Sequence, residues 1–182
     1  MTDLWTMNAA DGELLLRTGV KGRAARMGHR LTIAMTRWQA TVRWADANPV
    51  AAELVIEAGS FEVISSQGGV KGLSGPEKAL VRSNALSSLD ASHFPEICFA
   101  AAVIEETEKG YRLTGTLAIR GIQRDHVIDL HTEDLGDSWR MSAGSTVRQS
   151  AYRIKPYSLL MGSVQVADDV ALSFTALHAK DY

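Results

Sequence analysis

Several features that mark common protein classes are scarce in this sequence. Its one cysteine, Cys98, excludes an internal disulfide and a zinc site built on several thiolates. No apolar run reaches the roughly 20 residues that a membrane-spanning helix needs. The first thirteen residues, MTDLWTMNAADGE, lack the basic stretch and apolar core of a signal peptide. We therefore expect a cytoplasmic protein with no transmembrane segment.

The sequence also lacks an excess of positive or negative charge. The formal net charge is -2 over 182 residues, which gives no bulk electrostatic reason to expect a nucleic acid or an anionic membrane as partner. Apolar residues make up 46% and charged residues 22%, as is usual for a soluble globular protein. The length predicts one domain, residues 1–182, with a core from about residue 12 to residue 178.

The most ordered pattern lies in residues 91–132. An apolar run at 97–104 is followed by a Gly-containing turn and by residues 111–120, where apolar and polar side chains alternate. Gly121 breaks this run, and residues 127–132 resume it. Alternation bounded by glycine turns is typical of antiparallel strands joined by tight hairpins. Counting such segments along the chain gives about eight strands, and their spacing alone allows a barrel or a sandwich.

Two longer strand candidates change their alternation partway. Apolar residues occupy odd positions up to Met35 and even positions from Trp38 onward, and the segment 52–64 switches in the same way after Gly59-Ser60. A strand cannot change the face of its side chains without an extra residue or a bend. In a hairpin centred on residues 46–49 the two switches face each other, which suits a strongly curved sheet.

Two helical segments interrupt the strands. Ser74-Gly75-Pro76-Glu77 has the pattern of a helix start, with a Ser cap and Glu three residues later, and predicts a helix to about Leu86. A shorter helix is expected around residues 23–27. Its basic side chains Arg23 and Arg26 have two interpretations, a solvated helical face or a positive rim for an anionic lipid headgroup.

The order of three motifs resembles the YceI-like family. These are Asp90, the run His93-Phe94-Pro95-Glu96-Ile97-Cys98-Phe99, and the run 113–121 (LTGTLAIRG). The resemblance implies an all-β, antiparallel, eight-stranded lipocalin-like barrel with a short helical insertion, which holds a polyisoprenoid or another long apolar lipid. One departure is Arg153, which stands where relatives carry a glycine, and an Arg disfavours positive φ.

Inward-facing side chains are the candidates for a lipid cavity. From the residues alone, these side chains either pack together or surround one slender ligand, and the resemblance favours the ligand. No cofactor or metal is expected beyond a bound isoprenoid-type lipid. The candidates for the cavity are Leu31, Ile33, Trp38, Trp44, Phe61, Phe99, Tyr111, Leu113, Leu117, Ile119, His126, Trp139, Tyr152, Tyr157 and Phe174.

Catalytic patterns are sparse. The chain has no G-x-S-x-G motif and no helical pair of histidines at zinc-binding spacing. His126 shares the strand face of Ile128 and Leu130, so it could face a cavity. We therefore expect a non-catalytic lipid-binding protein, and two alternatives stay open. One is a hydrolase or isomerase that uses a cavity histidine on an apolar substrate, and the other is a stress-associated interaction scaffold working through residues 65–89. A homodimer is also left open.

Overall fold

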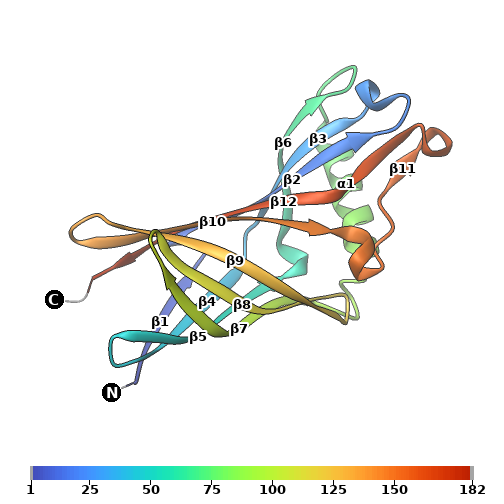
Figure 1. The fold of residues 1–182 in the computed structure, drawn as a ribbon. Helices are drawn as coiled ribbons and strands as arrows, with labels where there is room; N and C mark the ends of the chain where they lie inside the picture. The colour runs from blue at the N-terminus through green and yellow to red at the C-terminus, as the bar shows by residue number, and fades with distance from the viewer. Residues whose placement is uncertain (1, 181–182) are drawn as a thin grey trace.

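The computed structural model describes residues 2–180 and consists mainly of one twelve-stranded antiparallel sheet (Figure 1). Hydrogen-bonded neighbours follow the order β1-β4-β5-β7-β8-β9-β10-β12-β2-β3-β6, and β11 pairs with β12. The strands are β1 (Thr2–Asn8), β2 (Gly12–Lys21), β3 (His29–Met35), β4 (Trp38–Ala45), β5 (Asn48–Glu57), β6 (Phe61–Gly68), β7 (Glu96–Thr107), β8 (Gly110–Ile119), β9 (Ile122–Asp134), β10 (Ser138–Arg148), β11 (Ser158–Leu159) and β12 (Val164–Ala179). The helices are α1 (Gly75–Ser88) and the short 3-10 turns η1 (Ala25–Met27), η2 (Ala58–Ser60), η3 (Gln149–Tyr152) and η4 (Leu160–Gly162).

The sheet curls into a half-barrel, and the expected all-β antiparallel class is confirmed. The predicted count of eight strands is not confirmed. One reason is that each of the two long strands with an alternation switch is divided at a bend, into β3 and β4 and into β5 and β6. Another is that β1 and β11 were not predicted, because residues 2–8 show no clear alternation and β11 is only two residues long.

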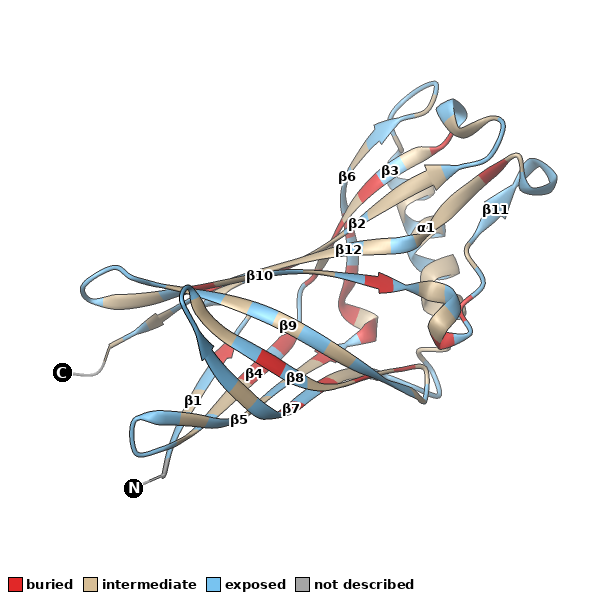
Figure 2. Ribbon diagram, in the orientation of Figure 1, coloured by how far each residue is buried: buried red, intermediate tan, exposed pale blue. Residues whose placement is uncertain are grey.

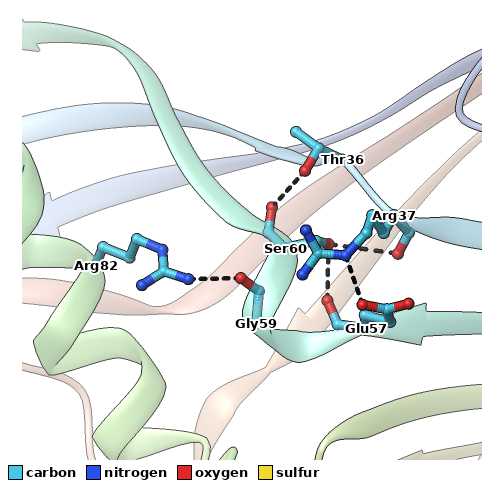
Figure 3. A network of polar contacts seen from close by, with 6 residues as sticks. All are labelled: Thr36, Arg37, Glu57, Gly59, Ser60 and Arg82. Carbon is cyan, nitrogen blue, oxygen red and sulfur yellow. Dashed lines mark hydrogen bonds and ion pairs between the residues drawn. The ribbon is translucent and has the colours of Figure 1, made fainter.

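The two bends lie opposite each other, as the sequence spacing predicts (Figure 3). One separates β3 from β4 at Thr36 and Arg37, and the other is η2, between β5 and β6. The Thr36 N–H donates to the Ser60 carbonyl over 3.1 Å, and the Glu57 N–H donates to the Arg37 carbonyl over 3.0 Å. These two bonds continue the pairing through the bends, so the sheet turns sharply without leaving those polar groups bare.

Side-chain hydrogen bonds also stabilise the bend between β5 and β6. Ser60 is the one buried polar residue in the described chain, at 3% exposure, and its Oγ donates to the Glu57 carbonyl over 2.7 Å. The Arg82 guanidinium on α1 donates to the carbonyls of Gly59 and Phe61 over 2.6 and 3.0 Å. The helix is therefore tied directly to the bend, as Figure 3 shows.

The helix α1 begins as its sequence predicts. Ser74 and Glu77 form a reciprocal capping box, in which each side chain accepts from the other residue's backbone N–H, and Pro76 occupies the first turn. The helix connects β6 to β7, two strands that do not pair with each other, and Figure 1 shows it lying on that side of the curled sheet. Arg153 adopts the left-handed conformation, with φ 54°, although an Arg side chain disfavours positive φ.

Replacing Ser60 tests the contribution of the bend. We expect Ser60→Ala to lower the free energy of unfolding by about 1–2 kcal/mol, because the Glu57 carbonyl loses the hydroxyl donor of the buried Ser60. Urea unfolding followed by tryptophan fluorescence measures this change. The matched control is Ser65→Ala on β6, which is exposed and should change stability by less than about 0.5 kcal/mol. Equal effects of the two substitutions would show that the bend adds no specific stability.

Candidate functional site

A cavity of about 770 Å³ lies inside the curled sheet. Its wall is built from the inward side chains of most strands and from one face of α1, and most of them are apolar. Figure 2 shows that buried residues are scattered along the strands rather than gathered into one solid centre. The volume falls in the range of pockets that hold small molecules, about 300–1,000 Å³.

Ten of the residues predicted from the sequence line this cavity. They come from β3, β6, β7, β8, β9 and β12 and from the segment before β11. They are Leu31, Ile33, Phe61, Phe99, Leu113, Leu117, Ile119, His126, Tyr157 and Phe174. Strand alternation placed these side chains correctly because, on a curled sheet, one face of each strand points inward.

Three predicted tryptophans do not line the cavity. Trp38 packs edge-on against Phe174, with ring centroids 5.2 Å apart, so the phenylalanine forms the wall in its place. Trp44 lies 4.6 Å from Trp5 of the unpredicted strand β1. Trp139 is covered by the Lys180 ammonium, which lies 4.5 Å above its ring. In each case the indole ring contacts a partner far away in sequence.

Two predicted tyrosines also lie outside the cavity wall. Tyr152 is buried at 3% exposure within η3, where it packs in a cluster with Phe99 and Val147. Tyr111 is half-buried against the same cluster, near the turn between β7 and β8. Arg23 and Arg26 are exposed on and beside η1 and do not line the cavity, although the next residue, Met27, does.

The part of the cavity wall that α1 forms was not among the lipid-cavity residues predicted from the sequence. The helix α1 contributes Glu77, Leu80, Val81, Asn84 and Ala85 to the cavity. The spacing of 80, 81 and 84 does indicate a helix face, but this face has few large apolar residues, so the apolar pattern that would identify it is weak. The segment 65–89 therefore forms part of the cavity wall.

The wall contains one inner polar pair. His126 on β9 and Ser145 on β10 place Nε2 and Oγ 2.6 Å apart, and the Phe99 ring meets the imidazole edge-on at 6.2 Å. Burial lowers the pKa of His126 below its usual value near 6.5, so the neutral imidazole is favoured at pH 7. The pair is thus a neutral hydrogen-bonding group in a mostly apolar surface.

A local opening of the sheet accounts for this pair. The backbone pairing of β9 with β10 is confined to Leu130–Asp134 and Trp139–Ala143, and beyond them the strands diverge (Figure 1). His126 and Ser145 lie in the diverging part. Their side-chain hydrogen bond therefore joins two strands whose backbones no longer pair there.

The other titratable side chains of the wall make no hydrogen bond with this pair in the described residues. His29, Glu53 and Glu77 also belong to its wall, but none of them is hydrogen-bonded to His126. Burial and the nearby Glu96 and Glu53 raise the pKa of the Cys98 thiol, which is not part of the wall. Within residues 2–180, no three His, Cys, Asp or Glu side chains gather in a geometry that could hold a metal ion.

The curled antiparallel sheet, the attached helix and the mostly apolar interior define an all-β half-barrel, and comparison with known proteins gives the family. The sequence profile of the YceI-like domain matches residues 5–177, so the chain belongs to the YceI-like family. The crystal structure of BcnA from Burkholderia cenocepacia is similar at 18% identity and a TM-score of 0.69, covering 94% of this chain and 98% of that one. The Campylobacter jejuni YceI protein matches at 16% identity and a TM-score of 0.58, covering 82% and 85%.

At these identities the two structures bear on the fold alone. A comparison with curated proteins finds no significant match. Neither α1 nor any other helix within residues 2–180 has the length and apolar character needed to cross a bilayer.

The half-buried His126 should make stability depend on pH. Because the pKa of His126 is lower in the folded protein than in the unfolded chain, its contribution is complete above about pH 6.5 and is lost as the pH falls toward the folded value. We expect the unfolding free energy of wild type to decrease more between pH 7.5 and 5.5 than that of His126→Gln, which cannot titrate. Urea unfolding at both pH values measures the difference.

His93 contributes an opposite trend, since its hydrogen bond to Asp90 raises its pKa, but both proteins share it. Parallel pH profiles for wild type and His126→Gln would contradict the assignment of a neutral, half-buried His126.

Proposed function

We propose that this protein binds a long apolar lipid inside the sheet and performs no chemistry on it. The observation that carries the proposal is the cavity of about 770 Å³ with a mostly apolar wall. Each CH₂ group moved from water into such a wall is worth about 0.8 kcal/mol, so a long chain needs no covalent attachment. Membership of the YceI-like family supports the same class of ligand.

The polar pair narrows the ligand class. A neutral imidazole beside a hydroxyl can exchange hydrogen bonds with a carbonyl or an alcohol, but it offers no positive charge to balance a buried carboxylate or phosphate. We infer that an isoprenoid quinone or alcohol suits the inner wall better than an ionised fatty acid. A fatty-acyl chain would need its charged end at the mouth of the cavity.

A catalytic alternative rests on the same two residues, because a serine within hydrogen-bond distance of a histidine can act as a nucleophile. Such a pair usually needs a third group that orients the histidine. Among the described residues, Ser145 is the hydrogen-bond partner found for the His126 ring. Binding without turnover is therefore the function we propose, and hydrolysis of an apolar ester remains a result that would overturn it.

Filling the cavity tests the proposal. Ala143 on β10 lines the cavity between Leu130 and Phe174, its neighbours on the adjacent strands, and Ala171 on β12 is exposed on the outside. We expect Ala143→Phe to weaken the uptake of geranylgeraniol about tenfold, because the added ring displaces roughly two CH₂ groups of the ligand. Displacement of a fluorescent polyene fatty acid measures the affinity.

Ala171→Phe is the control and should bind like wild type, with thermal unfolding recorded for both variants. Native mass spectrometry of protein purified gently from its host would identify the natural cargo. Wild-type protein that takes up neither probe, or equal binding by both variants, would reject the cavity as the lipid site.

A further inference from the structure

One end of the molecule exposes large apolar side chains around the cavity. We call the set Met27, Val70, Leu159, Leu160 and Met161 the mouth patch, and their exposures are 53%, 88%, 53%, 59% and 106%. Figure 2 shows β11 and the turn after it as exposed. Large apolar side chains that are exposed together on a protein often mark a binding surface for another protein, a ligand or a membrane.

The mouth patch is assembled from three separate segments. The Ala24 N–H donates to the Ser163 carbonyl over 2.8 Å, which joins η1 to the end of η4. His29 Nε2 lies 2.6 Å from the Lys71 carbonyl, which joins β3 to the loop before α1. Figure 1 shows these loops together at one end of the curled sheet. Met27, Leu159 and Leu160 also line the cavity, so the patch surrounds its mouth.

The backbone holds the tip of this patch in an unfavourable shape. Leu160 and Met161 have φ of 49° and 56°, in the left-handed region that side chains other than Gly, Asn and Asp rarely adopt. The strained turn presents Met161 outward with no cover from the described residues. A backbone under strain with its largest side chains in water is more consistent with a contact surface than with a passive loop.

Charge is polarised along the molecule. The three mouth segments, residues 20–30, 66–73 and 155–166, carry six Lys or Arg side chains and no Asp or Glu. Lys21, Arg23 and Arg26 are exposed, and none of the ion pairs found in residues 2–180 involves them. The turns at the other end, residues 105–109 and 133–137, carry six Asp or Glu side chains and one Lys.

We propose that the mouth patch docks the protein on the surface of an anionic lipid bilayer, with the cavity opening toward the membrane. Exposed apolar side chains surrounded by unpaired cations match the two components of such a surface, the acyl boundary and the negative headgroups. The anionic bilayer repels the acidic turns at the far end and attracts the basic mouth segments. Both effects favour the orientation in which the mouth patch faces the membrane. The small net charge of -2 conceals this polarity, because the two ends cancel.

Vesicle cosedimentation tests the docking. The protein is mixed with phosphatidylcholine vesicles, with or without phosphatidylglycerol. We expect Val70→Ser combined with Met161→Ser to reduce binding to the anionic vesicles at least tenfold. Neither residue lines the cavity, so uptake of geranylgeraniol from solution should stay unchanged. This second measurement separates a failure of docking from a failure of the proposed cargo function.

The matched control is Leu4→Ser combined with Leu177→Ser, two exposed leucines on β1 and near the end of β12. It should bind vesicles like wild type. Arg23→Gln with Arg26→Gln should lower binding on the order of tenfold, and only when phosphatidylglycerol is present.

Three results would overturn the proposal. They are wild-type protein that does not bind anionic vesicles, equal loss in the mouth and control variants, and binding that ignores phosphatidylglycerol. A fourth result would overturn the proposal by identifying a different binding partner for the mouth patch. If Val70→Ser with Met161→Ser converts a dimer to a monomer in analytical ultracentrifugation and leaves vesicle binding unchanged, the patch serves a second copy of this chain.

Discussion

Backbone hydrogen bonding at the two facing bends is the constraint on which the shape of this protein depends. A strand that turns sharply breaks its ladder, and each broken bond leaves a polar group that must find another partner. Here both strands bend at the same level. Thr36 and Glu57 donate across the bend, and the Ser60 hydroxyl and the Arg82 guanidinium reach the carbonyls that remain. The sheet can therefore curl strongly at a small cost.

The curl in turn creates the cavity. Because β6 follows β3 away from β5, it does not pair with β7, and the chain between them folds as α1 on that side of the sheet. The inward side chains form two buried clusters that share the partly buried residues Leu54, Ile97 and Leu130. Protein interiors are normally packed as densely as organic crystals. An apolar space of this size forgoes many dispersion contacts, which the hydrocarbon chain of the proposed ligand would restore.

The sequence predicts local order well and long-range partners poorly. Alternation located the strands and the paired bends because both depend on residues close together in the chain. The capping box located the start of α1 for the same reason. The tryptophans were misplaced because their partners, Trp5, Phe174 and Lys180, lie far away in sequence. An apolar residue on the correct face can line a cavity or fill the space beside it, and only the fold decides between them.

The hydrogen-bonded pair His126 and Ser145 also depends on a long-range contact that the sequence does not reveal. Strand parity places His126 with Ile128 on the inner face, but no local pattern reveals that β9 and β10 diverge and bring Ser145 within reach. An isolated polar group in an apolar wall would carry a large desolvation cost, whereas two that bond to each other do not. The mostly apolar wall can therefore accommodate both residues. Because an imidazole has two ring nitrogens and a hydroxyl can both donate and accept, the pair retains hydrogen-bonding capacity for one neutral polar group of a ligand.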